Sequence, residues 1–384
     1  MDDEATNTCQ SQGHTVPISL RPRLSQPRTR WAVPGAAAAV VAVALVVTPM
    51  VADASPALPP RTAAELLAST RAAVDHPFSG TVVQTARLGL PDLPRSGHGA
   101  STSLSLASLI TGSHTARIWY AGPERVRVAL VGDFAQTDMI RSGRDAWTWN
   151  SADNTAKHLT LPAHDDRRPS PSTLTPDQAA QQALAAIDPT TAVTVEGTAS
   201  VAGRSAYELV LRPRDTRSLV GQVRLAVDST TSTPLRVEVF ARGGTKPAFE
   251  TAFSSIQFAT PSASLFTFRP PRGAKVTEQT LPAEPTAAQR KAYADRRAAA
   301  AGERPTVVGT GWTTVLVAKG VDLSNATGPE LTALLRSAKQ VSGSYGSGRV
   351  VQTALVSALL LDDGRLLMGS VTPQVLEQAA AASR

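Results

Sequence analysis

The sequence predicts an α+β fold: one large curved antiparallel β-sheet of about ten strands with helices on its concave face, followed by a small C-terminal α+β domain. Three observations predict it. Apolar and polar residues alternate, with the period of half-buried strands, through residues 115–161 and again through residues 192–271. A helix start precedes each of these two groups of strands. Strands and helices do not alternate one by one, as they would in a parallel sheet.

Composition favours a globular protein without disulfides. The 384 residues are 42% apolar, which is enough for a sizeable core, and the single cysteine, Cys9, cannot form an intramolecular disulfide. The formal net charge of +7 is spread among acidic residues, and no run of five basic residues occurs. The charge therefore favours anionic surfaces such as phospholipid head groups, and we expect no nucleic-acid binding.

The first 54 residues have the pattern of a membrane-targeting segment. Residues 1–30 are rich in arginine toward their end, and residues 31–54 contain an apolar stretch from Trp31 to Ala52. Positive charge before an apolar run keeps the N-terminus in the cytoplasm and places the bulk of the chain outside. Two interpretations stay open. The segment is a transmembrane anchor, since about 20 apolar residues span a bilayer, or a signal peptide cleaved after Ala54, since small residues stand at the required spacing.

The elements that follow begin with a Pro-rich linker at residues 55–61. Thr62 and Glu65 have the spacing of a capping box and predict a helix over residues 62–74. A strand is expected at residues 81–86. Residues 88–114 break the strand pattern but stay apolar in part, so they form either a lid or a flap packed on the core.

The first meander starts with two strands in residues 115–131, which turn at Gly122 and Pro123. It continues through residues 136–141, 146–150 and 155–161. A second helix is expected over residues 175–187, where Thr175 is the N-cap and Pro176 takes the first helical position. The second meander comprises residues 192–197, 205–213, 221–228, 234–242, 248–258 and 265–271.

The main domain is therefore expected to span residues 62–276. Residues 277–305 are polar and Ala-rich, as in a linker. Residues 306–384 form the small C-terminal domain, with strands at 306–318, 349–361 and 365–371 and helices at 327–340 and 372–382.

No motif indicates catalysis. Residues 309–311, Gly-Thr-Gly, lead into β-branched residues rather than into the helix N-terminus that a dinucleotide site needs. His158, His164, Asp165 and Asp166 are close in sequence, but no second Cys/His group completes a metal site. The six histidines are scattered, and no nucleophile is placed by a motif. We therefore expect no enzyme, no cofactor and no metal.

Two of the five tryptophans, Trp147 and Trp149, are two residues apart on one predicted strand, so their side chains share a face of the sheet. If that face is the concave one, the rings line a cavity. Otherwise they are core packed under a helix. Alternation alone does not tell which face is concave.

Several stretches resemble one protein family. They are AAELLAST, FSGTVVQT, YAGPERVRV, SGRDAWTW, VAGRSAYELVLRPRD, GQVRLAVDSTTSTPLRVEVFA and FTFRPPRGAKV. Together they cover about residues 62–276 and resemble the LolA/RseB-like family of extracytoplasmic lipid-binding proteins, in particular actinobacterial members of the LolA-like carrier or RseB (MucB) type. These motifs are structural rather than catalytic.

The resemblance implies an unclosed antiparallel β-barrel, with helices at its open side and an apolar cavity that accepts acyl chains. Carriers of the LolA type transport lipoproteins, whereas RseB-type members sense envelope lipids or proteins and restrain sigma-factor release. On this basis the residues expected to line the cavity are Trp119, Val126, Val128, Trp147, Trp149, Leu209, Val237 and Val239.

The sequence thus predicts non-catalytic, extracytoplasmic binding of lipid or lipoprotein acyl chains. The alternative is a regulatory protein that binds a membrane-bound anti-sigma factor or another envelope partner. The protein would be membrane-associated through residues 31–52 if the segment is not cleaved, and secreted if it is.

Overall fold

The computed structural model describes residues 57–73, 76–89, 112–132, 135–162, 175–185, 187–280, 291–292, 295, 305–320 and 336–383. They belong to one compact unit, residues 55–384, which is distinct from residues 1–54. Among the described residues, no helix is long and apolar enough to cross a membrane. The predicted anchor at residues 31–54 and most of the predicted lid at residues 88–114 lie outside the described residues.

Both predicted helix starts of the main domain are confirmed. Helix α2 (Ala63–Arg71) begins with a complete capping box, in which the Glu65 N–H donates to Thr62 Oγ1 (3.2 Å) and the Thr62 N–H donates to Glu65 Oε2 (2.7 Å). Helix α4 (Pro176–Ala185) begins with the Gln178 N–H donating to Thr175 Oγ1 (3.2 Å). Each cap satisfies backbone donors that have no partner within the first turn.

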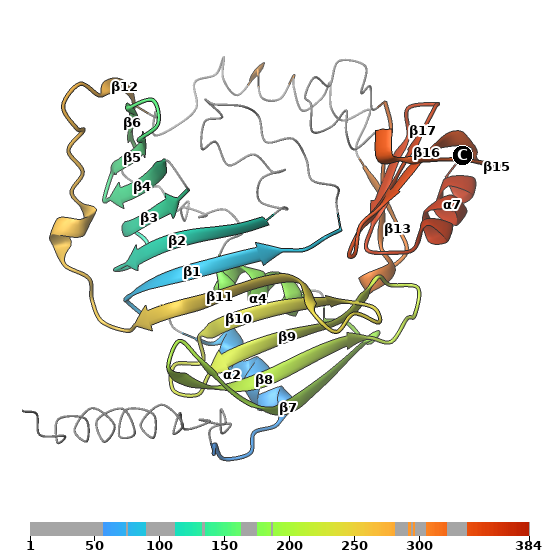
Figure 1. The fold of residues 1–384 in the computed structure, drawn as a ribbon, viewed down its shortest axis with the longest axis horizontal. Helices are drawn as coiled ribbons and strands as arrows, with labels where there is room; N and C mark the ends of the chain where they lie inside the picture. Colours follow the sequence, from blue (N-terminus) through green and yellow to red (C-terminus); the bar gives the residue numbers. More distant parts are fainter. Residues whose placement is uncertain are drawn as a thin grey trace, which may run out of the picture. The chain divides into compact units, whose positions relative to one another are not determined.

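The described residues build one sheet of twelve strands (Figure 1). The first meander consists of β1 (Phe78–Ala86), β2 (Gly112–Tyr120), β3 (Arg125–Val131), β4 (Gln136–Ser142), β5 (Asp145–Asn150) and β6 (Thr155–Thr160). The second consists of β7 (Thr191–Val201), β8 (Arg204–Pro213), β9 (Val220–Asp228), β10 (Pro234–Ala241) and β11 (Pro247–Gln257), and β12 (Lys275–Thr280) completes the sheet.

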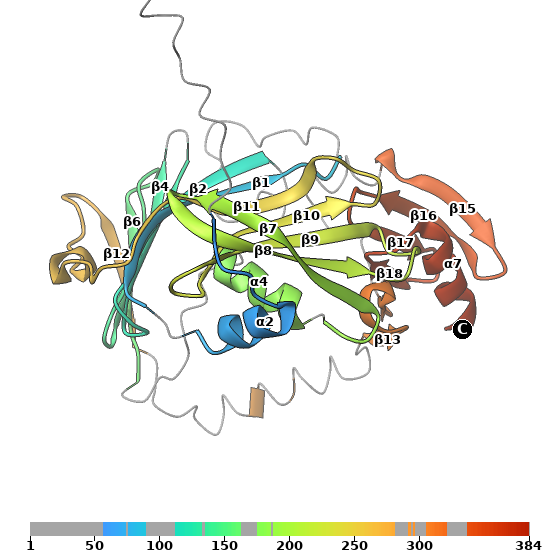
Figure 2. The ribbon, with the colours of Figure 1, turned by 90° about the horizontal axis from the view of Figure 1, so that it is seen from below.

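The strand order is β12-β6-β5-β4-β3-β2-β1-β11-β10-β9-β8-β7, so the two meanders meet where β1 pairs with β11. β6 therefore lies next to one edge of the sheet, whereas β7 forms the opposite edge. The chain crosses the sheet between them, and α4 is part of this crossing. Helices α2 and α4 both lie on the concave side of the curved, unclosed sheet, as the sequence predicts (Figure 2).

Three details differ from the sequence prediction. The expected strand at residues 265–271 is wrong: a 3-10 turn, η1 (Ala263–Phe266), is followed by unpaired chain. Proline explains this, because Pro261, Pro270 and Pro271 have no N–H for a strand ladder. The sheet is also not purely antiparallel, since β12 pairs with β6 in parallel. Finally, β12 extends to Thr280, beyond the predicted end of the main domain at residue 276.

A second sheet of six described strands follows, in the order β13-β14-β18-β17-β16-β15. Its strands are β13 (Thr306–Val308), β14 (Val315–Ala318), β15 (Lys339–Gly343), β16 (Gly346–Gln352), β17 (Ser357–Leu361) and β18 (Leu366–Gly369). Helix α7 (Pro373–Ala382), predicted over residues 372–382, packs on β17 and β18. The predicted helix at 327–340 lies mostly outside the described residues, and its last two residues belong to β15.

The two faces of the six-stranded sheet differ. On the α7 face, Leu359, Leu367 and Leu376 are fully buried in a continuous core. The opposite face leaves Val307, Leu316 and Met368 exposed, although they pair side by side on β13, β14 and β18.

Hydrogen bonds join the six-stranded sheet to the larger one. The Leu219 N–H donates to the Ser370 carbonyl (2.8 Å), and the Ala354 N–H donates to the Leu88 carbonyl (2.8 Å). The Trp312 Nε1–H donates to Thr191 Oγ1 (2.8 Å). The two sheets therefore share an interface, and the boundaries predicted for a separate domain at 306–384 stay a prediction.

Candidate functional site

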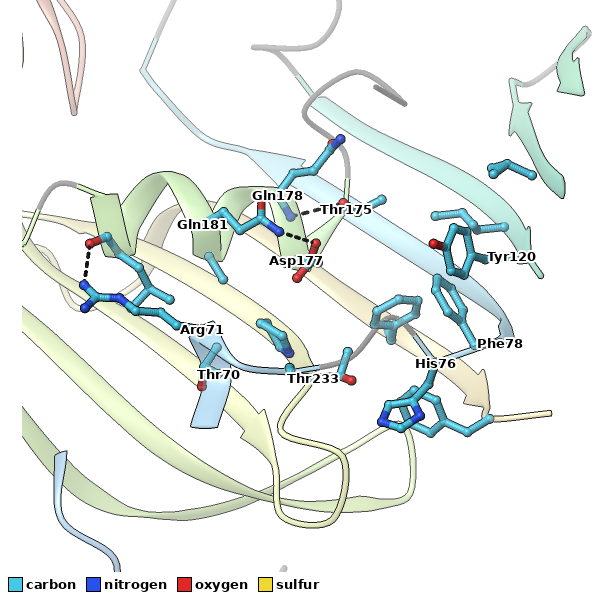
Figure 3. A pocket seen from close by; sticks show the side chains of 18 of the residues that line it. Thr70, Arg71, His76, Phe78, Tyr120, Thr175, Asp177, Gln178, Gln181 and Thr233 are labelled. Carbon is cyan, nitrogen blue, oxygen red and sulfur yellow. Dashed lines mark hydrogen bonds between the residues drawn. The ribbon is translucent and has the colours of Figure 1, made fainter. Parts of the chain in front are cut away.

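A cavity of about 860 Å³ lies on the concave side of the twelve-stranded sheet, under α4 and beside the end of α2 (Figure 3). Its size is within the range of roughly 300–1,000 Å³ that is usual for small-molecule sites. The walls come from β1, β2, β3, the β9–β10 turn, β11 and the two helices. The cavity is therefore formed where the two meanders meet.

The floor of the cavity is apolar and is set by strand register. Phe78 of β1 pairs with Tyr120 of β2, and Tyr120 pairs with Val126 of β3, so the three side chains share the concave face. Ile118, two residues from Tyr120, adds to the same face. Phe253 of β11 closes the floor, with its ring edge-on to that of Phe78 at 5.6 Å.

A glycine lets the Phe253 ring lie close to β1. A Cβ atom at Gly80 would come within 3.0 Å of that ring and within 2.7 Å of the Ser255 carbonyl oxygen. Side-chain carbons do not approach backbone oxygen so closely, so any larger residue here would force β1 and β11 apart. Gly80 therefore shapes one end of the floor.

Polar side chains gather along the helical wall and at the mouth. Asp177 and Gln181 of α4 point to this side, and the Gln181 Nε2–H donates to Asp177 Oδ2 (2.9 Å). Arg71, at the end of α2, donates from Nη2 to the Leu184 carbonyl (3.4 Å) and so holds the end of α2 to the end of α4. His76 lies at the other side of the mouth, with its ring edge-on to Phe258 at 6.2 Å. The site thus combines an apolar floor with a polar rim.

The tryptophan pair lies on the opposite face. Trp147 of β5 pairs with Ile140 of β4, and Ile140 pairs with Arg127 of β3, so these three side chains share one face of the sheet. Val126 lines the cavity and is next to Arg127 in β3, so its side chain points to the opposite face. The stretch after η1 covers this outer face, and its Phe268 ring lies 5.2 Å from Trp147 and 6.3 Å from Trp149. The tryptophans are thus packing residues on the outer side and do not line the cavity.

Polar contacts reinforce this outer packing. The Trp147 ring stacks on His158 at 4.1 Å, and His158 Nε2 lies 2.9 Å from Asp145 Oδ1. Trp119 lies on the same face, with the Arg127 guanidinium 5.3 Å from its ring. Arg127 also bonds to Asp138 (2.7 Å), whose side chain is almost fully buried. These contacts give the aromatic and charged groups on β2–β6 structural partners.

The other predicted site residues divide as follows. Val126 lines the cavity. Val128 is buried beside Ile118 in the core that underlies the floor. Leu209 and Val237 are fully buried in the core beneath α2 and α4, and Val239 packs against that core. Whether any of them contacts a ligand stays a prediction.

Sequence reasoning missed most of the floor, namely Phe78, Ile118, Tyr120, Phe253 and Phe258. A signal for Ile118 and Tyr120 was present. The predicted hairpin at Gly122 and Pro123 pairs β2 with β3, so residues on β2 that lie opposite Val126 and Val128 must share their face. Phe253 and Phe258 depend on the pairing of β1 with β11, which joins residues far apart in sequence and has no local signal.

Among the described residues, no group of three His, Cys, Asp or Glu side chains is placed to hold a metal ion. Of the acidic and histidine cluster considered above, only His158 is described, and it contacts Asp145 and Trp147. The Gly-Thr-Gly stretch at residues 309–311 leads into the 3-10 turn η3 (Gly311–Thr313) rather than a helix.

No family model and no curated protein matches the chain. Solved structures are similar to it. MucB in the Pseudomonas aeruginosa MucA/MucB complex is 17% identical, with 83% of this chain and 96% of that chain covered and a TM-score of 0.39. An uncharacterized conserved protein from Thermus thermophilus is 14% identical, with 56% and 99% covered and a TM-score of 0.31. The LolA superfamily protein NE2245 from Nitrosomonas europaea is 12% identical, with 54% and 99% covered and a TM-score of 0.20. The fold described here follows from the strand order and registers of the chain itself.

Proposed function

We propose that the protein binds the acyl chain of a lipid or lipoprotein, without catalysis, in the cavity between α4 and the concave face of the sheet. The observation that carries this proposal is the apolar floor, in which Phe78, Ile118, Tyr120, Val126 and Phe253 face an open volume of about 860 Å³. Each methylene group moved from water into such a site contributes roughly 0.8 kcal/mol. A single long alkyl chain therefore supplies enough free energy for binding without any specific polar contact.

Uptake of a fluorescent fatty acid by the full-length, lipid-stripped chain tests the proposal. The cavity variant is Ala73→Phe, because Ala73 is partly buried and lines the cavity, so a phenyl ring there takes up ligand space. The matched control is Trp147→Phe on the outer face. We expect saturable uptake by the natural chain and by W147F, and at least about tenfold weaker uptake by A73F. Absence of uptake by well-folded natural chain would contradict the proposal.

The alternative that the sequence resemblance implies is regulatory binding of a membrane-bound anti-sigma factor or other envelope partner. It becomes the better account if a folded chain takes up no apolar probe but retains a membrane protein in a pull-down. The topology expected for residues 1–54 belongs to the same proposal, with the main part of the chain outside the cytoplasm. Mass spectrometry of the mature N-terminus tests it, since a start at Ser55 shows cleavage and an intact segment shows an anchor.

A further inference from the structure

The positive and the negative side chain at the rim of the cavity lie at different places. Arg71 is the only arginine or lysine among the described residues that line the cavity, and Asp177 is the only carboxylate there. Figure 3 shows Asp177 on α4 and Arg71 apart from it, at the end of α2. Arg71 contacts Leu184, seven residues after Asp177, which corresponds to roughly 10 Å along the helix axis. The two groups are therefore too far apart to form an ion pair.

Their hydrogen-bonding states also differ. Asp177 already accepts the amide hydrogen of Gln181. The Arg71 guanidinium has five N–H donors and makes one long bond, at 3.4 Å, to a backbone carbonyl. The neighbouring hydroxyl group of Thr70 is occupied within its own helix, since Thr70 Oγ1 donates to the Leu66 carbonyl (2.8 Å). The spare hydrogen-bonding capacity of this end of the rim is thus cationic.

Several arginines of the twelve-stranded sheet are paired with carboxylates. Arg204 pairs with Asp228, Arg236 with Glu208, and Arg127 with Asp138. No carboxylate of the described residues pairs with Arg71 in this way. A planar guanidinium with free donors matches a carboxylate or a phosphate in geometry as well as in charge.

We propose that the ligand is an amphiphile with a single anionic head group, held at the rim by Arg71 while its alkyl chain lies on the ring-lined floor. This inference rests on the proposed function and defines the ligand class of the same cavity. A carboxylate head, as in a fatty acid, and a phosphate head, as in a phospholipid fragment, share the chemistry that Arg71 recognises.

Competition with the bound fluorescent probe tests the inference. The competitors are a fatty acid, an alkyl phosphate and a fatty alcohol of equal chain length, used on the full-length chain. Because Arg71 is exposed, its ion pair with a head group is expected to give about a fivefold preference for an anionic competitor over the alcohol. The preference should shrink as salt rises. The competitor with the larger preference identifies the carboxylate or the phosphate as the natural head group.

The variant is Arg71→Gln, and Arg61→Gln is the matched control, because Arg61 is an exposed arginine just before α2 that does not line the cavity. R71Q should remove the preference for an anionic competitor over the alcohol, whereas R61Q should keep it. Equal binding of all three competitors, or an equal loss of all three in R71Q, would overturn the inference while leaving the proposed function intact. Failure of the natural chain to take up the probe at all would overturn both.

Discussion

Helices α7 and α4 each pack on one face of a β-sheet in the described part of the chain, and what lies beneath them differs. On the six-stranded sheet, α7 packs directly on β17 and β18, and the core between them includes Leu359 and Leu376, which are fully buried. On the twelve-stranded sheet, α4 packs on β10 and β11, while β1, β2 and β3 bound an open volume beside it. A helix packed on a sheet thus gives a compact core in the smaller region and borders the candidate binding cavity in the larger one.

The difference follows from dimensions. Twelve strands at about 4.8 Å spacing extend over roughly 50 Å of curved sheet, whereas a helix with its side chains is only about 10 Å wide. Two helices, α2 and α4, cannot cover the whole concave face. Helix α4, which lies between β6 and β7 in the chain, covers part of the apolar concave surface. The cavity is thus a consequence of strand order rather than of a particular motif.

Replacing one valine by alanine in each region is expected to give the largest difference in the free energy of unfolding. Val317 of β14 is fully buried in the six-stranded core, whereas Val126 faces the cavity. Val317→Ala should lower the free energy of unfolding by about 2–3 kcal/mol, because it removes two methyl groups and leaves a void. Val126 is also mostly buried, but it borders the open volume, so the space left by Val126→Ala adds to the cavity and forms no closed void. Val126→Ala should therefore cost only the transfer free energy of its two methyl groups, about 1.5 kcal/mol.

Denaturant unfolding of the ligand-free protein measures both values. Equal losses would mean that the cavity wall is packed as densely as the six-stranded core, and the contrast between the regions would fail.

Removing the cap residue of a helix should give a smaller difference in stability between the two regions. In α2, Thr62 makes a reciprocal capping box with Glu65, whereas Thr372 before α7 makes no side-chain capping bond. Thr62→Ala should therefore cost about 1 kcal/mol and Thr372→Ala roughly 0.3 kcal/mol or less. Thermal unfolding of both variants checks this. A loss of stability in T62A that is smaller than the loss in T372A would show that packing, and not its cap, holds α2.

The smallest expected effect concerns buried charge. In the six-stranded sheet, buried Arg365 is satisfied by Asp363 (2.8 Å) and by the carbonyls of Ala380 (2.7 Å) and Tyr345 (3.0 Å). In the larger sheet, burial raises the pKa of Glu238, and nearby Arg236 offsets this only in part. A raised folded-state pKa favours the neutral form, so this contribution to stability is present at acid pH and lost as pH rises through that pKa.

Glu238→Gln mimics the neutral form. We expect it to raise the free energy of unfolding at pH 7 by less than about 1 kcal/mol, with the gain vanishing below the unperturbed pKa of about 4.3. Urea titrations at neutral and acid pH test the sign. Destabilisation at neutral pH would show that the ion pair with Arg236 outweighs burial.

The elements whose formation depends on residues near one another in the chain could be predicted from the sequence. The capping residues Thr62 and Thr175 placed α2 and α4, and alternation placed the strands of both meanders. The same alternation predicted that Trp147 and Trp149 share a face, but the side of the sheet is set by long-range register and by the chain carrying Phe268. Residues 265–271 alternate like a strand, yet the prolines around them prevent pairing. The pairing of β1 with β11, which completes the cavity, has no local signature.

The central claim is that an alkyl chain lies in the cavity and not in the compact core of the smaller sheet. A fatty acid with a spin label on its chain tests this directly, through the methyl NMR signals of the full-length protein. The label should broaden the signals of Ile118 and Val126, which line the cavity, and leave those of Val317 and Leu359 in the six-stranded core sharp. Sharp signals at Ile118 and Val126 under saturating ligand would contradict the account.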